Sequence, residues 1–497
     1  MDTVLLLAPI GLSLLAAAGH GLAGWRRTTG WAGVAATALL LGVAVALAVT
    51  VQRDGPVSAL GGLLRADALS GWMLLVVGAV ALLACWASPS YLAVAHAGPA
   101  AATTSGEALP ANRARWYGIL LHLFIAAMST AVLAGNLGLL WVAIEATTIV
   151  TAFLVGHHRS RTALEAAWKY VVICSAAIAI AFLGTMLLYY AARHAGLSAD
   201  AALDWRTVAD HAGELDPSVT RIAIGLAVLG FGAKAGLVPL HAWLPDAHSQ
   251  APAPISALMS GVLLSVAFYA VLRFKAVADA ALGVGYLRGL LLVLALATLA
   301  LAAVLLLGQR DYKRMLAYSS MEHMALLAVG AAAGGPLAIS AVLLHIAGHG
   351  LAKSVAFLGS GHLLRTEGTT EIAAVRGLAG RTPLLAGVYG LAVLALLGLP
   401  PSAVFASQLG IARAGFTAGI GWAVAVALLL ALVGFAAIAA RTSGMLLGSS
   451  DSPTAALSRT AAAPLVTGLV AVAALGVAAW PLTSLLYGAA SVLGATP

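Results

Sequence analysis

The chain has 497 residues, of which 62% are hydrophobic and only 9% are charged, whereas an average soluble domain has about 25% charged residues. A soluble core cannot absorb this much apolar surface, so the composition excludes an ordinary soluble protein. Apolar runs of about 20 residues recur along the whole chain, and a helix of that length crosses the hydrocarbon core of a bilayer. The sequence therefore predicts an all-α polytopic membrane protein.

The net charge of +8 comes from 26 Lys and Arg against 18 Asp and Glu. Most of these bases fall between the apolar runs, so we interpret the excess as an orientation signal and expect no nucleic-acid partner. The two cysteines, Cys85 and Cys174, lie in apolar stretches without the spacing of metal ligands. We therefore expect no metal and no cofactor in this chain.

Fourteen apolar segments are predicted to span the membrane. The first follows Met1-Asp2-Thr3, which lacks the basic region of a cleavable signal, so we expect it to be retained. More Lys and Arg residues then fall in cytoplasmic loops if both termini lie on the non-cytoplasmic side of the cell membrane. In chain order, the segments are 4–22, 31–51, 68–93, 116–135, 137–156, 166–191, 219–238, 251–274, 287–308, 313–333, 336–363, 383–412, 418–446 and 463–490.

Three of the five lysines, Lys169, Lys234 and Lys353, fall inside these segments, whereas every arginine is expected in a loop or at the end of a span. A desolvated lysine can lose its proton, but arginine cannot. An ionisable group at this depth is costly and is by default a functional candidate, although a lysine can also snorkel to the surface or play a structural role.

Glu145 lies near the middle of the fifth segment, where Thr147 and Thr148 are its nearest polar neighbours. A lone buried carboxylate would stay protonated, so we expect a cationic partner on another helix.

Two segments carry helix-breaking residues. Gly232, Gly236 and Pro239 interrupt the seventh segment, and Gly398, Pro400 and Pro401 interrupt the twelfth. Broken helices at membrane depth face protein or a hydrated cavity, and transporters place ion sites there. The breaks are five segments apart, which predicts two inverted five-helix repeats. The expected domains are 1–115 (helices 1–3), 116–274 (helices 4–8), 275–447 (helices 9–13) and 448–497 (helix 14).

Two motifs make the sequence recognisable. Residues 234–261 and 309–324 resemble the proton-conducting, antiporter-like subunits of respiratory complexes. That superfamily includes the M, L and N subunits of NADH-quinone oxidoreductase, the large subunits of multisubunit cation/proton antiporters, and membrane subunits of group 4 hydrogenases. Residues 141–148 and 163–170 look most like hydrogenase-4 component F.

The resemblance implies a hydrated polar axis along the membrane midplane. Glu145 and Lys234 match the family's charge pair, His323 and His349 match its histidines, and Lys353 lies one turn after His349. The candidate pathway residues are Glu145, Lys169, Lys234, His241, His248, His323, His345, His349, Lys353 and Gln408. The alternative for the histidines is a satisfied core position, and for His241, His248 and Asp246 it is a solvated site at the cytoplasmic end of the break.

The implied function is proton translocation within a hydrogenase or NADH-quinone oxidoreductase-like complex, whose other membrane subunits and surrounding lipid would be the partners. Electrons would move in other subunits, so we expect this chain to be non-catalytic. At an effective dielectric of about 20, two charges attract by about 4 kcal/mol at about 4 Å and by about 2 kcal/mol at about 8 Å. Our hypothesis is that Glu145 gates proton release from Lys234 by such a separation.

Two positions depart from the family pattern. Ser265 stands where M-type subunits have a lysine in the eighth span, and Gln408 stands where the twelfth span has an acid or a lysine. Neither side chain can carry the charge. These departures keep two alternatives open, namely a structural anchor subunit that does not pump and a subunit of a cation/proton antiporter.

Overall fold

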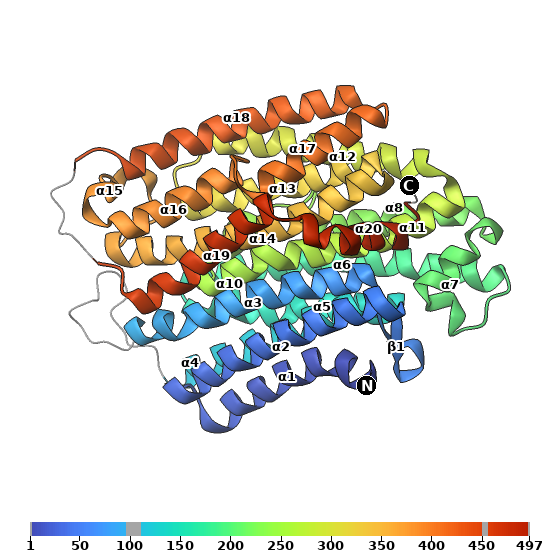
Figure 1. Cartoon of the computed structure of the whole chain (residues 1–497), viewed down its shortest axis with the longest axis horizontal. Coiled ribbons are helices and arrows are strands. Elements are labelled where there is room, and N and C mark those ends of the chain that lie inside the picture. The colour runs from blue at the N-terminus through green and yellow to red at the C-terminus, as the bar shows by residue number, and fades with distance from the viewer. Residues whose placement is uncertain (1, 96–110, 450–455, 496–497) are drawn as a thin grey trace.

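The computed structural model describes residues 2–95, 111–449 and 456–495, which form a single bundle of helices lying side by side along the long axis of the molecule (Figure 1). The helices are α1 Asp2–Ala23, α2 Arg27–Asp54, α3 Ala68–Ala95, α4 Ala111–Leu133, α5 Leu137–Val155, α6 Arg161–His194, α7 Trp205–Asp210, α8 Pro217–Lys234, α9 Trp243–Gln250, α10 Ala253–Leu258, α11 Leu264–Leu282, α12 Val284–Leu307, α13 Tyr312–Ala333, α14 Gly335–Glu367, α15 Leu378–Arg381, α16 Pro383–Leu396, α17 Ala403–Thr417, α18 Gly421–Leu446, α19 Arg459–Val477 and α20 Thr483–Val492.

Eleven helices of the described ranges are long and apolar enough to cross a membrane. The chain is therefore a multi-pass membrane protein. The predicted segments 219–238, 313–333 and 383–412 are the three without a counterpart among these eleven. The first and third contain the breaks, and α13, which matches the second, carries several charged and polar side chains, so its mean hydropathy is low.

Both predicted breaks are present as interruptions of the helices. α8 ends at Lys234, and Gly236 adopts a φ of +89°, where a Cβ would also lie only 2.6 Å from Leu244 Cδ1. Only glycine fits such a position without strain. The second break separates α16 from α17, and Ser402 caps the new helix by accepting a hydrogen bond from the backbone N–H of Phe405 at 3.2 Å.

One predicted segment is wrong in detail, and one element was not predicted. The segment 463–490 is not one span, because α19 ends at Val477 and a short helical turn, Trp480–Leu482, precedes α20. Pro481 lies in that turn and cannot supply a backbone N–H to continue a helix. The loop after α2 also contains a small antiparallel hairpin, β1 Val57–Ala59 and β2 Leu64–Ala66, that the apolar pattern does not predict.

Arg273 corrects the expectation that every arginine lies in a loop or at the end of a span. It is 1% exposed inside α11 and forms an ion pair with Asp67, which precedes α3, through contacts of 2.8 and 2.9 Å. Its guanidinium also lies 4.1 Å from the ring centre of Trp205. The planar, forked guanidinium suits a buried pairing of this kind better than lysine would. This pair ties α3 to α11.

The centre of the bundle is α14, which contacts α3, α10, α13, α16, α17, α19 and α20. Both α14 and the continuous segment Ala253–Leu282 are buried along their most apolar stretch. They cross closely at two glycines, because a Cβ on Gly261 would lie 2.8 Å from the carbonyl oxygen of Gly350. Gly261 belongs to a π-helical turn, Met259–Leu263, between α10 and α11, and such turns are frequent at functional sites.

Candidate functional site

Lys234 is fully buried at the first break, where the last turn of α8 faces α5 and α6. Its Nζ donates hydrogen bonds to Thr148 Oγ1 at 2.8 Å and to the Tyr170 hydroxyl at 2.6 Å. The ammonium also lies 4.6 Å from the ring centre of Tyr170 and 5.9 Å from that of Trp243, within the range of cation–π attraction. Hydroxyls and aromatic faces thus replace water around a buried cation.

Glu145 lies one turn before Thr148 on α5 and is partly buried. Its Oε1 accepts a hydrogen bond from Ser175 of α6 at 3.1 Å, and its Oε2 is buried without a hydrogen-bond partner among the described residues. Glu145 and Lys234 do not form the direct ion pair that we expected. Glu145 is hydrogen-bonded to Ser175 instead, and Lys234 is hydrogen-bonded to the hydroxyls of α5 and α6. The two side chains are nevertheless brought to the same α5–α6–α8 junction.

A line of small polar groups continues from α9 to α13. His248 is fully buried beside Phe357, and both of its ring nitrogens lack hydrogen-bond partners in the described ranges. Ser260, in the π-helical turn, bonds Ser320 of α13 at 2.7 Å. Ser265 is fully buried, and its hydroxyl has no hydrogen-bond partner among the described residues.

Lys353 is fully buried on α14. Its Nζ donates to the backbone carbonyl of Leu316 at 2.6 Å and to Oγ of Ser319, both on α13. Like Lys234, it is held by neutral oxygen atoms and not by a carboxylate.

Three histidines gather between α13 and α14, one turn from Lys353. Their ring centres are 4.9 to 6.4 Å apart. A hydrogen bond of 3.1 Å joins His323 Nδ1 to His345 Nε2, and another of 2.9 Å joins His345 Nδ1 to Ser407 Oγ on α17. His349 is buried with no partner for either ring nitrogen within the described part of the chain. Only His345 thus has both ring nitrogens hydrogen-bonded among the three.

Lys169 and His241 lie away from this buried set. Lys169 is half exposed in the early part of α6, where its Nζ contacts Glu165 at 2.7 Å and Asp246 at 3.1 Å. Arg314 reaches the same Asp246 at 2.9 Å. His241 is partly buried in the break, and its Nδ1 lies 3.2 Å from the carbonyl oxygen of Pro239. Lys169 thus lies in an ionic cluster with Glu165, Asp246 and Arg314, within the candidate span Arg161–His194.

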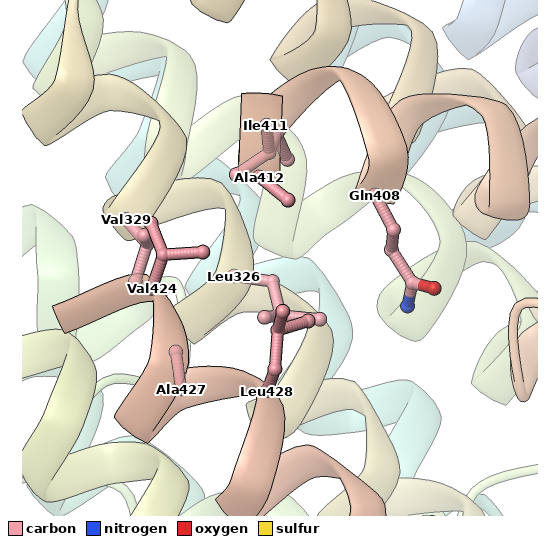
Figure 2. Close-up of a pocket in the computed structure, with 8 residues that line it drawn as sticks. All are labelled: Leu326, Val329, Gln408, Ile411, Ala412, Val424, Ala427 and Leu428. Carbon is pink, nitrogen blue, oxygen red and sulfur yellow. The ribbon is translucent and has the colours of Figure 1, made fainter. Parts of the chain in front are cut away.

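Gln408 lies in the second turn of α17, at the edge of a small cavity of about 10 Å³ between α13, α17 and α18. Figure 2 shows that Gln408 supplies the polar group among the eight labelled side chains, the others being apolar. Its Nε2 has no hydrogen-bond partner in the described ranges. A bound water needs about two to four polar partners, so this cavity is a poor place for one.

Sequence reasoning missed one acid and several hydroxyls. Glu322 is 2% exposed on α13, directly before His323, and neither carboxylate oxygen has a hydrogen-bond partner among the described residues. The signal was a glutamate near the middle of the predicted span 313–333, next to His323. Tyr170, Ser319 and Ser407 contact the candidate residues, but their partners are distant in the chain and no local pattern marks them.

The buried groups form separate hydrogen-bonded clusters, centred on Glu145, Lys234, Lys353 and His345. His248 and His349 carry free ring nitrogens between or beside these clusters. In the described part of the chain, no group of three or more His, Cys, Asp or Glu side chains is arranged to hold a metal ion.

Residues 134–434, more than half of the chain, match the family described as "NADH:quinone oxidoreductase/Mrp antiporter, TM". The hydrogenase-4 component F homolog of Methylacidiphilum infernorum is 40% identical over 302 residues, which are 61% of this chain and 63% of that relative. This match thus spans less than two thirds of the relative's length. NADH-quinone oxidoreductase subunit N of Desulforudis audaxviator is 32% identical over 390 residues, covering 77% of this chain and 74% of the relative.

Solved structures share the fold. A chain of the membrane-bound sulfane sulfur reductase, an archaeal respiratory membrane complex, superimposes with a TM-score of 0.86 at 24% identity, covering 99% of this chain and 97% of its own. A chain of the Mrp complex from Dietzia sp. gives 0.86 at 21% identity with the same coverage. With the family match over residues 134–434, the broken helices and the buried lysines, this chain belongs to the NADH:quinone oxidoreductase/Mrp antiporter transmembrane family.

Proposed function

We propose that this chain is the proton-translocating membrane subunit of a respiratory-type oxidoreductase complex, of the group 4 hydrogenase or NADH-quinone oxidoreductase-like kind. The observation that carries the proposal is the pair of fully buried lysines, Lys234 and Lys353, each bound only by neutral oxygen atoms. An anchor subunit has no use for two such costly groups. A proton carrier needs groups that are stable in either charge state.

The hydroxyls around Lys234 suit both of its charge states. Thr148 and Tyr170 accept hydrogen bonds from the ammonium, and each can turn its own O–H toward a neutral amine. Glu145, one turn from Thr148, changes the electrostatic potential at Lys234 when it gains or loses a proton. Gating by Glu145 therefore acts through its electrostatic potential, without the direct contact that our first hypothesis assumed.

The histidines give the second half of the pathway. A neutral imidazole carries one donor and one acceptor nitrogen, so the bonds from His323 to His345 and on to Ser407 can pass a proton by tautomer exchange. Near this series of hydrogen bonds, the ring nitrogens of His248 and His349 have no hydrogen-bond partner among the described residues. We propose the midplane order Glu145, Lys234, His248, Lys353 and the three histidines, with Lys169 and His241 near the point of entry.

The finer topology belongs to the proposal as well. We propose fourteen spans, inverted repeats over 116–274 and 275–447, and termini on the non-cytoplasmic side; the two broken helices support the repeats. In Figure 1 the start of α1 and the end of α20 lie at the end of the bundle that holds β1 and α7. Labelling from outside intact cells should modify Ser198→Cys, near α7, and should spare Ser443→Cys, near the end of α18.

The partners we propose are neighbouring membrane subunits and lipid. Apolar side chains on the outer helices α5, α6, α12 and α18 are widely exposed, among them Phe153 at 66%, Trp168 at 70% and Val293 at 67%. Exposed apolar surface of this extent needs a hydrocarbon or protein neighbour. The related structures are chains of multisubunit membrane complexes, which supports the same assignment.

Two other functions have an observation in their favour. Ser265 and Gln408 cannot titrate, which favours an anchor subunit with a silent channel. The family description includes Mrp antiporters, which favours a cation/proton antiporter. A sodium site needs several oxygen ligands, however, and intramembrane carboxylates are few here.

The test is proton uptake into sealed vesicles that contain the purified parent complex, driven by its own electron transfer. Lys234→Ala should abolish uptake while electron transfer continues. Lys275→Arg is the matched control, because it changes a lysine on α11 outside the pathway while keeping a positive charge for Asp279, and it should leave uptake intact. Unchanged uptake in Lys234→Ala would favour the anchor, and sodium-dependent uptake would favour the antiporter.

A further inference from the structure

Glu322 is a buried acid in the second half of the described chain that the pathway above does not use. It lies in the middle of α13, is 2% exposed, and neither Oε1 nor Oε2 has a hydrogen-bond partner among the described residues. An ionised carboxylate in such a place is very costly unless a cation is near. Either it stays protonated or it exchanges a proton with a neighbouring base.

The neighbouring base is available on the next helix. Lys353 of α14 interacts electrostatically with Glu322, and Lys353 is itself bound to Ser319, three residues before Glu322 on α13. His323, the next residue in the chain, begins the histidine cluster. Glu322 therefore lies at the point where the lysine and the histidine cluster meet.

Titratable groups also lie on the other helices packed against α13. On α11 the charged ones are bound in the ion pairs Arg273–Asp67 and Lys275–Asp279. On α18 the titratable group is Arg441, which is bound to the carbonyl oxygens of Leu307 and Gln309. On α12 Arg288 binds the carbonyl oxygens of Ala332 and Ala333 at the far end of α13. On α17 and α9 the titratable groups are Arg413, Asp246 and His248.

The carboxyl group points toward α18, at a position where that helix lacks a side chain. A Cβ built on Gly434 would lie 2.8 Å from Oε2 and 3.0 Å from Oε1 of Glu322. Any other residue at 434 would displace the acid, so the glycine makes the space that the carboxyl group occupies. The absence of a side chain at Gly434 on α18 thus leaves the space that the Glu322 carboxyl group on α13 fills.

The family resemblance implies a titratable group at the position of Gln408, and Gln408 borders an apolar cavity (Figure 2). The same cavity is lined by Leu326, which lies one turn along α13 from Glu322. Gln408 cannot bind a proton. The second half thus has an uncharged side chain after its break and an unassigned acid on the adjacent helix.

We propose that Glu322 is a proton-binding residue of the pathway and takes the place that Gln408 cannot fill. The proton leaves Nζ of Lys353, whose N–H bond breaks, and binds a carboxylate oxygen of Glu322, where an O–H bond forms, relayed by water. The ammonium and the carboxylate both become neutral, so the total charge of the pair is conserved. This inference rests on the proposed function, because it assigns a residue to the same proton pathway.

The experiment compares Glu322→Gln with wild type in sealed vesicles of the parent complex, at equal electron-transfer turnover. Glutamine keeps the size but cannot bind the proton, so uptake should fall by about two orders of magnitude, a typical contribution of a positioned proton-transfer group. Glu322→Asp should restore part of it. Glu214→Gln, in an exposed outer turn, is the matched control and should behave as wild type.

A second pair of variants tests the geometry without touching the acid. Gly434→Ala should lower uptake because its methyl group displaces the carboxyl group, whereas Gly444→Ala on the same helix meets no atom within 4 Å and should have no effect. Infrared difference spectra should show a carboxylic C=O band during turnover that disappears in Glu322→Gln. A purely structural acid would give no such band.

The outcomes separate this inference from the proposed function. If Lys234→Ala stops uptake while Glu322→Gln transports at the wild-type rate without loss of the infrared band, Glu322 is not in the pathway and the proposed function stands. If both variants transport normally, both ideas are wrong. If Glu322→Gln fails to assemble, wild-type uptake in Gly434→Ala together with an absent carboxylic band in the wild-type protein overturns the inference.

Discussion

The two halves of the bundle each contain a broken helix, yet they place their ionisable groups differently. In the first half, Lys234 lies at the break itself and is held by hydroxyls of α5 and α6. In the second half, the residue after the break is Gln408, beside an apolar cavity. The ionisable side chains of that half lie instead on the central helices α13 and α14, where Lys353, Glu322 and the histidines are buried.

This difference shows that a broken helix in this fold does not have to carry an ionisable side chain. The prolines and glycines create a break wherever the helix must be interrupted, but the chemistry depends on which buried side chains lie nearby. A break without a titratable residue is compatible with transport only if an adjacent helix supplies the group. The variants below test that statement from the largest expected effect to the smallest.

Removing Asp67 should have the largest effect, and it acts on stability. Asp67→Ala leaves Arg273 as a buried charge without its partner, which costs about 3 to 5 kcal/mol. The unfolding temperature of the detergent-solubilised complex should fall clearly. Asp210→Ala removes only the exposed pair with Arg206, which is worth at most about 1 kcal/mol, so equal losses in the two variants would contradict the account.

Tyr170→Phe should have an intermediate effect, confined to the first half. It removes the hydroxyl that accepts from Lys234 Nζ, a charged hydrogen bond worth about 1.5 to 3 kcal/mol. Proton uptake per turnover should slow by about tenfold or more, since each 1.4 kcal/mol corresponds to a factor of about ten. Tyr190→Phe, on the exposed part of the same helix, should match wild type. Wild-type proton uptake in Tyr170→Phe would mean that the hydroxyls around Lys234 are not needed for transport.

Gln408→Met should have the smallest effect. Methionine fills a similar volume and suits the apolar cavity, so uptake should stay within about twofold of wild type, a change of about 0.5 kcal/mol or less. The same vesicle assay measures it, with Lys234→Ala as the inactive reference. A strong loss of uptake would mean that the amide of Gln408 takes part in the pathway, and the contrast between the two halves would disappear.

Much of this fold could be predicted because its signals are local. The apolar runs locate the long helices, and the Gly and Pro clusters locate both breaks. The signal was weaker at the C-terminal segment, where Pro481 interrupts a run that hydropathy alone joins. The β1–β2 hairpin could not be predicted because it is three residues per strand and carries no alternating pattern of useful length.

The candidate site was predictable in its residue types but not in its contacts. A buried lysine or glutamate is visible in an apolar run, which is how Lys234 and Glu145 were found. Their partners are set by packing between helices distant in the chain, so the hydroxyls of Tyr170 and Ser407 could not be assigned. Arg273 was misplaced for the same reason, because its partner Asp67 is 206 positions away.

The most direct measurement of the central claim is proton uptake by Lys234→Arg in sealed vesicles of the parent complex, at electron-transfer turnover equal to wild type. Arginine keeps the positive charge and can bond the hydroxyls, but it does not release its proton at any accessible pH. If proton release from Lys234 is required, uptake falls to background while the complex assembles and electron transfer continues. Uptake at the wild-type rate would show that Lys234 serves only as a fixed charge and would contradict the account.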